Sequence, residues 1–245
     1  MDDIIIKDAF IKDTVSFITL SNLGYVDLTR NCYKTLENVG CIHSLKCYCI
    51  DEESEKILKE THSIANVFSV PNLKFGFKHM PKFRDENWNK VVINKFNIIF
   101  DNLLTSEYVL FTDGDIVYEK NGFVEFCLDK IQKDGADILI QNDGDHDSSR
   151  NNLCTGFMFI KSNETTRNFF DPSKINIQTF RCDQIHINHN KHKLHLSVLP
   201  LHLFPNGGYY KSHQSSIDEP FLIHFNWCGG DQKIRWMKNC QKYYV

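Results

Sequence analysis

Short apolar runs alternate with longer amphipathic stretches along most of this chain. The apolar runs are rich in β-branched and aromatic residues, which is typical of strands buried within a sheet. We predict strands at residues 15–20, 45–50, 65–70, 136–140, 153–160 and 194–203, and a central strand in the stretch 108–118. The first predicted helix is capped by Asp27 or Thr29 and runs to residue 36. Further helices are predicted at 52–61, 87–104, 122–132 and 164–170, and a closing helix runs to residue 240. A turn is predicted at 206–210. The alternation indicates an α/β fold with a Rossmann-like, mostly parallel central sheet flanked by helices.

One predicted helix carries a lysine beside its apolar stripe. Between residues 87 and 104 the apolar positions recur at steps of four, three and four, as on one face of a helix: Val92, Phe96, Ile99 and Leu103. Lys95 lies on the flank of this stripe, and the pattern alone favours an ordinary solvated lysine.

The central strand ends in two carboxylates. Asp113, Gly114 and Asp115 follow the apolar run that begins at Tyr108. In open α/β sheets, ligands bind at the carboxyl ends of the strands, so both carboxylates fall where a site is expected. The glycine lets the chain bend, and both carboxylates can then face one divalent cation that bridges the protein to a diphosphate. A solvated turn is the competing interpretation.

A third metal ligand is expected elsewhere in the chain, since two carboxylates rarely complete a site. His224 is the best candidate because it ends an apolar run and precedes Gly229, Gly230 and Lys233. Imidazole, flexible backbone and ammonium can thus gather at one diphosphate. The alternative is a histidine that serves only the core or the surface.

Two other groups of metal-ligating residue types carry less weight. The histidines at 186, 189, 192 and 195 are spaced by threes, so at most two or three share a helix face. A solvated histidine-rich loop is therefore favoured over a zinc site. Residues 141–150 imitate the start of a calcium loop, but no glutamate follows at the twelfth position. We expect them to form a mobile polar loop near the site.

Composition narrows the class of protein. Of 245 residues, 42% are apolar and 13% aromatic, so we expect one enzyme-sized globular domain over 1–245. The net charge is −3 with no long basic run, which argues against a nucleic-acid partner. Nine scattered cysteines without a Cys-x-x-Cys pair favour reduced thiols. Residues 1–8 fit neither a signal peptide nor a membrane anchor, so we expect a cytoplasmic protein.

Five short motifs follow one another along the chain: Phe17 to Tyr25, Asp113-Gly114-Asp115, Gly156-Phe157-Met158, Asp183-Gln184 with Asn188, and His224-x-Asn226 with Gly230 and Lys233. This set resembles the nucleotide-diphospho-sugar transferases, glycosyltransferases of the GT-A fold related to plant xylosyltransferases and more distantly to glycogenin. The resemblance covers residues 15 to 240. It departs from the family at Cys154-Thr155-Gly156, where an Asn-x-Gly is usual.

The resemblance implies a division within one GT-A domain. Residues 1–112 would form the nucleotide-binding half, and residues 113–245 the half for metal, donor sugar and acceptor. Asp113, Asp115 and His224 would bind manganese or magnesium. The residues implied to contact the nucleotide-sugar donor are Thr19, Ser21, Asn22, Tyr25, Lys95, Asp113, Gly114, Asn142, Gly156, Asn226, Gly230 and Lys233.

The resemblance also implies the reaction. A sugar would move from a nucleotide diphosphate, with UDP favoured over GDP, to a hydroxyl of a glycan, a small molecule or a protein, with retention of configuration. Asp183 would bind sugar hydroxyls, Gln184 would lie beneath the anomeric carbon, and Lys233 would stabilise the departing β-phosphate. The alternatives are a hydrolase or nucleotidyltransferase acting on the same diphosphate, a non-catalytic sugar-nucleotide-binding module, and a zinc protein built on the histidines.

Overall fold

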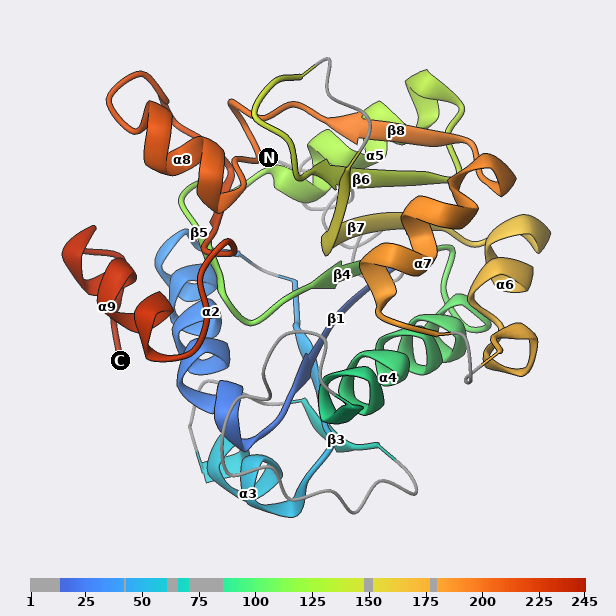
Figure 1. Cartoon of the computed structure of the whole chain (residues 1–245), viewed down its shortest axis with the longest axis horizontal. Coiled ribbons are helices and arrows are strands. Elements are labelled where there is room, and N and C mark those ends of the chain that lie inside the picture. Colours follow the sequence, from blue (N-terminus) through green and yellow to red (C-terminus); the bar gives the residue numbers. More distant parts are fainter. Residues whose placement is uncertain (1–13, 42, 61–65, 71–85, 148–151, 177–179) are drawn as a thin grey trace, which may run out of the picture.

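A mixed β-sheet runs through the middle of the molecule (Figure 1). The computed structural model describes residues 14–41, 43–60, 66–70, 86–147, 152–176 and 180–245. Within them the sheet has seven strands in the order β3-β2-β1-β4-β7-β6-β8, and β5 and β9 form a separate ribbon. The strands are β1 (Val15–Ser21), β2 (Lys46–Cys49), β3 (Val67–Ser69), β4 (Tyr108–Thr112), β5 (Ile116–Tyr118), β6 (Ile138–Asn142), β7 (Leu153–Lys161), β8 (Leu196–Leu199) and β9 (Leu222–His224).

Helices cover both faces of this sheet. One face packs against α2 (Val26–Asn38), α3 (Glu52–Glu60) and α5 (Phe123–Asp134). The other face packs against α4 (Glu86–Leu103), α6 (Glu164–Phe170) and α7 (Asp183–Asn190), which lie together on the right in Figure 1. The last two α-helices, α8 (Gly207–His213) and α9 (Asp231–Asn239), share a third apolar cluster with the β5–β9 ribbon. Short 3-10 helices are η1 (Leu23–Tyr25), η2 (Pro172–Lys174) and η3 (Lys191–Lys193).

The central strand β4 is buried on both faces. Leu110 packs into the cluster with α2 and α5, whereas Val109 and Phe111 pack into the cluster with α4, α6 and α7. Each of the three side chains is 0% exposed, as a continuous apolar run predicts for an interior strand. The α/β fold with a central sheet flanked by helices is therefore confirmed.

The order of the strands reverses at β1. The chain runs outward from β1 to β2 and β3, then returns to place β4 on the other side of β1, and all these pairs are parallel. Such a topological switch point is where open α/β sheets bind ligands. β7 runs antiparallel to β4 and β6, so its first residues lie at the same sheet edge as the ends of β1 and β4.

Three local predictions are wrong. Neither Asp27 nor Thr29 caps α2, which begins one residue earlier and directly after η1. The central strand predicted in the stretch 108–118 is β4, which ends directly before Asp113 as expected, and the short strand β5 follows the carboxylate turn.

The predicted strand 194–203 is shortened to β8, since Pro200 lacks the N–H that a longer ladder needs. The predicted turn 206–210 is the beginning of α8, whose first turn is capped by the Asn206 side chain.

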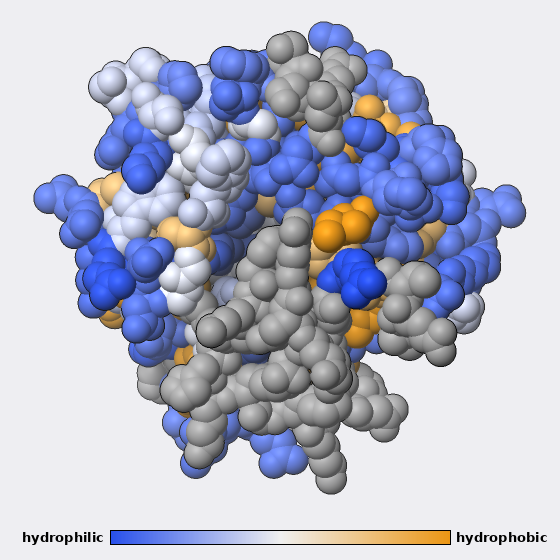
Figure 2. Space-filling model, in the orientation of Figure 1, coloured by the Kyte–Doolittle hydropathy of each residue, from blue (hydrophilic) through white to orange (hydrophobic). Residues whose placement is uncertain are grey.

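Some predicted features lie outside the described residues. These are Met1 to Asp8, Thr61 at the end of a predicted helix, Ala65 at the start of a predicted strand, and residues 148–150 of the polar loop. Within the described part of the chain, every helix is too short or too polar to span a lipid bilayer. The face of the molecule drawn in Figure 2 is largely hydrophilic.

Candidate active site

The site forms at the sheet edge where β1 and β4 end side by side. Asp113 follows β4, and its backbone N–H donates to the carbonyl of Gly156 in β7 (2.7 Å). In the antiparallel β5–β9 ribbon, the N–H of Phe225 donates to the carbonyl of Asp115 (3.0 Å). The ribbon therefore brings His224 to the two carboxylates that follow β4.

The three side chains that the sequence predicts as metal ligands form a cluster that could hold a metal ion. Nε2 of His224 lies 3.2 Å from Oδ1 of Asp115 and 4.0 Å from Oδ2 of Asp113. One ligand atom from each side chain lies within 4.8 Å of the other two. Among the described residues, no other three His, Cys, Asp or Glu side chains come together in this way.

His224 is held from its far side in an orientation suited to ligation. Its Nδ1 lies 2.8 Å from Oε1 of Gln141, so an Nδ1–H donated to this amide directs Nε2 toward the carboxylates. Burial lowers the pKa of His224, but the neighbouring Asp115 raises it well above the ordinary value, so a bound cation would replace a proton here. Two carboxylates and one imidazole suit manganese or magnesium.

Gly156 is required by this packing. A Cβ added at residue 156 would lie 2.1 Å from Cε1 of His224 and 2.9 Å from Oδ2 of Asp113. Contacts this short are repulsive, so any side chain here displaces a candidate metal ligand. The family motif that includes this glycine thus has a structural reason in this chain.

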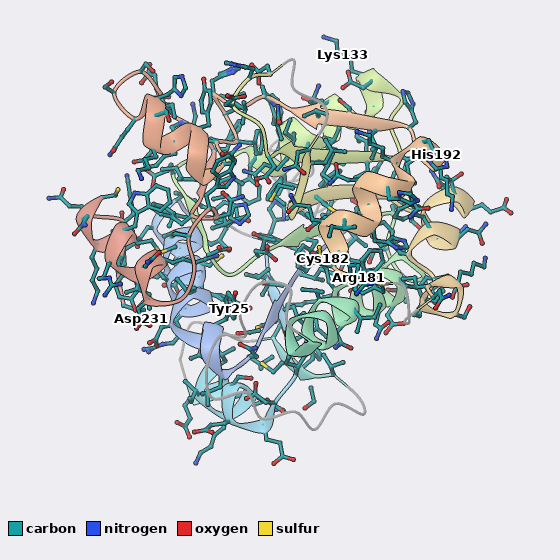
Figure 3. The ribbon with its side chains drawn as sticks, in the orientation of Figure 1. Tyr25, Lys133, Arg181, Cys182, His192 and Asp231 are labelled. Atoms are coloured by element: carbon teal, nitrogen blue, oxygen red, sulfur yellow. The ribbon has the colours of Figure 1, made fainter. Side chains whose placement is uncertain are left out.

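Lys233 lies on the other side of Asp115. Its Nζ pairs with Oδ2 of Asp115 and lies 6.0 Å from the centre of the Tyr25 ring. Burial would lower the pKa of Lys233, but Asp115 raises it above its ordinary value, so the amine is charged. Burial would raise the pKa of Asp115, but Lys233 and His224 hold it well below its usual range. Figure 3 shows Tyr25 on the same side of the molecule as Asp231, at the starts of α2 and α9.

Lys95 is buried, so its interpretation as a solvated lysine is wrong. Its Nζ lies 2.5 Å from Oδ2 of Asp183 and 3.2 Å from Oδ1 of Asp113. It also donates to the carbonyl of Thr155 (3.3 Å) and lies 4.6 Å from the centre of the Phe111 ring. Burial would lower the pKa of Lys95, but the two aspartates raise it above the ordinary value. The lysine is therefore a charged part of the site.

The two implied catalytic residues at the start of α7 are held by different partners. Asp183 accepts a hydrogen bond from the Thr155 hydroxyl (2.6 Å) in addition to its pair with Lys95. Burial would raise the pKa of Asp183, but Lys95 holds it below the ordinary value, so this carboxylate is ionised. The side-chain amide of Gln184 donates to Oδ2 of Asp143 (2.9 Å).

Asp143 is a residue beside the candidate site that the sequence analysis missed. Besides Gln184, its carboxylate accepts hydrogen bonds from Nδ2 of Asn226 (3.0 Å) and from Nε1 of Trp227 (2.9 Å). It therefore ties α7 to the segment after β9. The polar loop 141–150 indicated a place near the site, but no signal in the sequence singles out this carboxylate within it.

Two buried polar atoms stand out at the end of β1. Among the described residues, Oγ1 of Thr19 and Nδ2 of Asn22 have no hydrogen-bond partner, although buried polar groups nearly always find one. Ser21 is satisfied by the hydroxyl of Thr29 (2.9 Å). A Cβ at Gly114 would lie 2.7 Å from that same Thr29 hydroxyl, so Gly114 allows α2 and the carboxylate turn to approach closely. A polar ligand at the topological switch point could satisfy these two atoms.

The remaining residues that the resemblance implies are engaged mainly with the protein. Asn142 is buried, accepts from the N–H of Gly144 (2.7 Å) and donates to the carbonyl of His146 (2.8 Å). Oδ1 of Asn226 accepts from the N–H of Gly207 (2.6 Å). Gly230 has φ +53°, a conformation that favours glycine, and directly precedes α9.

The four histidines of the second cluster do not converge. His186 packs edge-on against Phe96, and Nδ1 of His195 lies 2.9 Å from the carbonyl of Gly135. In Figure 3 His192, in η3 beyond the end of α7, lies far from Cys182 at the beginning of α7. All nine cysteines are free thiols, as the sequence predicts.

The chain matches the protein-family model described as nucleotide-diphospho-sugar transferase over residues 44–237. It is also similar to a UDP-galactose:fucoside alpha-3-galactosyltransferase of Dictyostelium discoideum, with 26% identity over 90% of this chain and 41% of that protein. The chain thus spans less than half the length of this relative.

Solved structures of glycosyltransferases share the fold. A glycosyltransferase involved in the glycosylation of the major capsid of PBCV-1 superimposes with a TM-score of 0.56 at 11% identity, over 92% of this chain and 99% of that chain. Mouse xyloside xylosyltransferase 1 superimposes with a TM-score of 0.54 at 12% identity, over 87% of this chain and 98% of that chain. The GT-A fold predicted from the sequence is confirmed.

Proposed function

The chain belongs to the nucleotide-diphospho-sugar transferases, and from this premise we propose that it is a metal-dependent glycosyltransferase that transfers a sugar from a UDP-sugar to a hydroxyl acceptor. The observation that carries the proposal is the cluster of Asp113, Asp115 and His224, with Lys233 beside it, at the switch point of the sheet. UDP is favoured because the name of the Dictyostelium relative specifies a UDP-sugar donor.

The two halves of the chain take different parts of the donor. We assign the nucleotide to residues 1–112. There Thr19 and Asn22, at the end of β1, each carry a polar atom without a partner among the described residues, and Tyr25 follows in η1. We assign the metal, the donor sugar and the acceptor to residues 113–245. Lys95 connects the halves, because it lies in the first and pairs with Asp183 in the second.

Asp113, Asp115 and His224 would hold manganese or magnesium. When bound, the cation would supply Lewis-acid stabilisation of the charge on the diphosphate. Lys233 would donate to the β-phosphate from the opposite side, after its ammonium leaves the carboxylate of Asp115. Both contributions act on the leaving group, where negative charge develops.

The other side chains position the sugar. Asp183, kept ionised by Lys95, accepts hydrogen bonds from sugar hydroxyls. Gln184 is an amide and hence a weak nucleophile, so it supports the anomeric carbon rather than attacking it. The acceptor oxygen forms the new bond to the anomeric carbon on the face from which the phosphate departs, and the departing phosphate oxygen takes the acceptor proton. This order of events retains the anomeric configuration.

The test is thermal stabilisation by UDP, GDP and their sugar derivatives, with and without manganese. At a hundredfold excess over the dissociation constant, a true donor stabilises the fold by about 2.7 kcal/mol. We expect a manganese-dependent shift with the uridine series that disappears in Asp115→Asn. Asp145→Asn is the matched control, because its exposed carboxylate lies outside the metal cluster. A zero shift with all donors contradicts the proposal.

Product analysis then separates transfer from its rivals. Transfer releases a nucleoside diphosphate and a glycoside of the same anomeric configuration as the donor. A hydrolase or nucleotidyltransferase that cuts within the diphosphate releases a sugar phosphate and a nucleoside monophosphate instead. A binding module gives stabilisation without turnover, and an inverted product contradicts the proposed course of the reaction.

A further inference from the structure

Trp227 is an exposed aromatic side chain next to the site. It is 64% exposed, the highest fraction among the large hydrophobic side chains of the described residues that remain in solvent. It follows the candidate metal ligand His224 by two intervening residues and precedes the glycines before α9. An indole left in water forfeits the stabilisation that burial gives, so the fold alone does not account for this placement.

The exposed ring is nevertheless held in one position. Its Nε1 donates to Oδ1 of Asp143 (2.9 Å), and a Cβ added at Gly208 would lie 3.0 to 3.1 Å from three atoms of the indole. The backbone of Trp227 has φ +65°, which is unfavourable for a residue with a side chain. Strain of this kind persists where the surrounding structure enforces it and concentrates at ligand sites. The exposed and strained placement of Trp227 therefore lowers the stability of the fold.

The anchor of the ring also fixes its place relative to the reaction. Asp143 holds the indole through one carboxylate oxygen and Gln184 through the other. Along the sheet edge, the proposed nucleotide site lies at β1 and β4, whereas Asp143 follows β6, two strands beyond β4. Trp227 is thus coupled to the residue assigned to the anomeric carbon, on the side away from the nucleotide.

We propose that Trp227 is the stacking platform of the acceptor site and that the acceptor is a pyranose sugar. This inference rests on the proposed glycosyltransferase function. A pyranose presents an apolar C–H face and a polar rim, which match a flat indole bordered by hydrogen-bonding groups. Asp143 and the exposed amide of Asn152, which donates to it (2.8 Å), supply such groups beside the ring.

The test compares Trp227→Ala and Trp227→Phe with Leu104→Ala, a control at an exposed apolar residue far along the chain from the site. The probes are methyl pyranosides of galactose, glucose, fucose and xylose, with a serine-containing peptide as the competing acceptor class. We expect Trp227→Ala to raise the acceptor KM about tenfold, from the size of aromatic stacking contributions. Trp227→Phe, which keeps a ring but not the N–H, should recover part of this loss.

Two binding readouts separate this proposal from the proposed function. Calorimetry with UDP and manganese should give the same dissociation constant in Trp227→Ala and wild type, within twofold. Titration of the wild type with the preferred pyranoside should change the tryptophan fluorescence, and this change should be lost in Trp227→Phe. The proposed platform is overturned if Trp227→Ala loses affinity for UDP as much as for the acceptor. It is also overturned if Trp227→Ala and Trp227→Phe raise the acceptor KM equally, or if only the peptide accepts the sugar. If the wild type binds no nucleotide, the proposed function itself fails.

Discussion

Two buried lysines neutralise aspartates in this site, but they are held in different ways. Lys95, on the long helix α4, contacts two carboxylates, the carbonyl of Thr155 and the face of Phe111. Lys233, near the start of α9, pairs with Asp115, which is also a candidate metal ligand. Each lysine pairs with one candidate metal ligand, Lys95 with Asp113 and Lys233 with Asp115, but Lys95 also pairs with Asp183, which lies outside the metal-ligand cluster.

We call the Lys95 ammonium the fixed charge, because it keeps a partner within the fold. We call the Lys233 ammonium the exchangeable charge, because a cation can replace it at its carboxylate. The partners of Lys95 lie on α7 and at the end of β4, so its ion pairs stabilise the junction of these elements. A cation that binds Asp115 competes with Lys233 for the same carboxylate, and the ammonium is then free for a phosphate. We expect Lys95 to matter chiefly for stability and Lys233 chiefly for ligand binding and catalysis.

The largest effect is expected where both the lysine and the cation lose their partner. Asp115→Asn should lower kcat/KM for transfer by about 10³-fold, since several kcal/mol of charge stabilisation depend on the metal. Asp145→Asn, an exposed aspartate near His146, should retain wild-type kinetics. Steady-state assays of both variants give the comparison. A tenth or more of the wild-type activity in Asp115→Asn would exclude an essential metal at this cluster.

The variant Lys95→Met removes the fixed charge. Its loss leaves Asp183 buried without its cation, and breaking a buried pair in this way costs about 3–5 kcal/mol. Urea unfolding measures this cost, and adding Asp183→Asn in the same chain should recover part of it. Lys120→Met is the matched control, because its pair with Glu219 is exposed and worth about 1 kcal/mol or less. Equal effects of the two lysine variants would contradict the comparison.

The exchangeable charge should respond differently. Lys233→Met should lower kcat about 10²-fold, the size of effect expected for one charge-stabilising group, while manganese binds more tightly because no ammonium competes. Calorimetric titration with manganese measures that affinity. Lys238→Met on the same helix, whose ammonium lies over the Tyr243 ring, is the control. Weaker manganese binding in Lys233→Met would show that the lysine supports the metal site rather than competing with it.

The smallest expected effect is in the acid range. The pKa of Asp183 lies below its ordinary value because Lys95 outweighs the effect of burial. Its contribution to stability is complete above the unfolded pKa of about 3.9 and is lost as the pH falls through the lower folded value. Below about pH 4 the wild type should therefore lose stability more steeply than Asp183→Asn. Parallel curves from pH 6 to pH 2 would contradict this assignment.

The sequence was sufficient for the parts of the site that follow from strand ends. Asp113 and Asp115 were predicted because they end a buried apolar run, and His224 because it ends another. Their meeting depends on the β5–β9 ribbon, which no local pattern revealed, since its two strands are short and lie far apart in the sequence. The order of the five motifs along the chain supported the same grouping of residues through the resemblance to the family.

The residues that hold the site residues in place could not be predicted from local sequence patterns. The burial of Lys95 depends on Asp183 and Asp113, which lie far away in the sequence. Gln141 was visible only as a polar residue at the end of an apolar strand, and its bond to His224 joins two distant strands. Asp143 gains its role from Gln184, Asn226 and Trp227, none of which is near it in the chain.

The β5–β9 ribbon has a consequence for how the protein is made. Asp113 and Asp115 leave the ribosome about half a chain before His224 and Lys233, so a nascent chain can form most of its sheet without its metal ligands complete. Pairings between distant segments form late in folding, because loop closure must precede them. The proposed cation would therefore be bound only after synthesis of β9, and a chain that ends before His224 would lack one of the three candidate ligands.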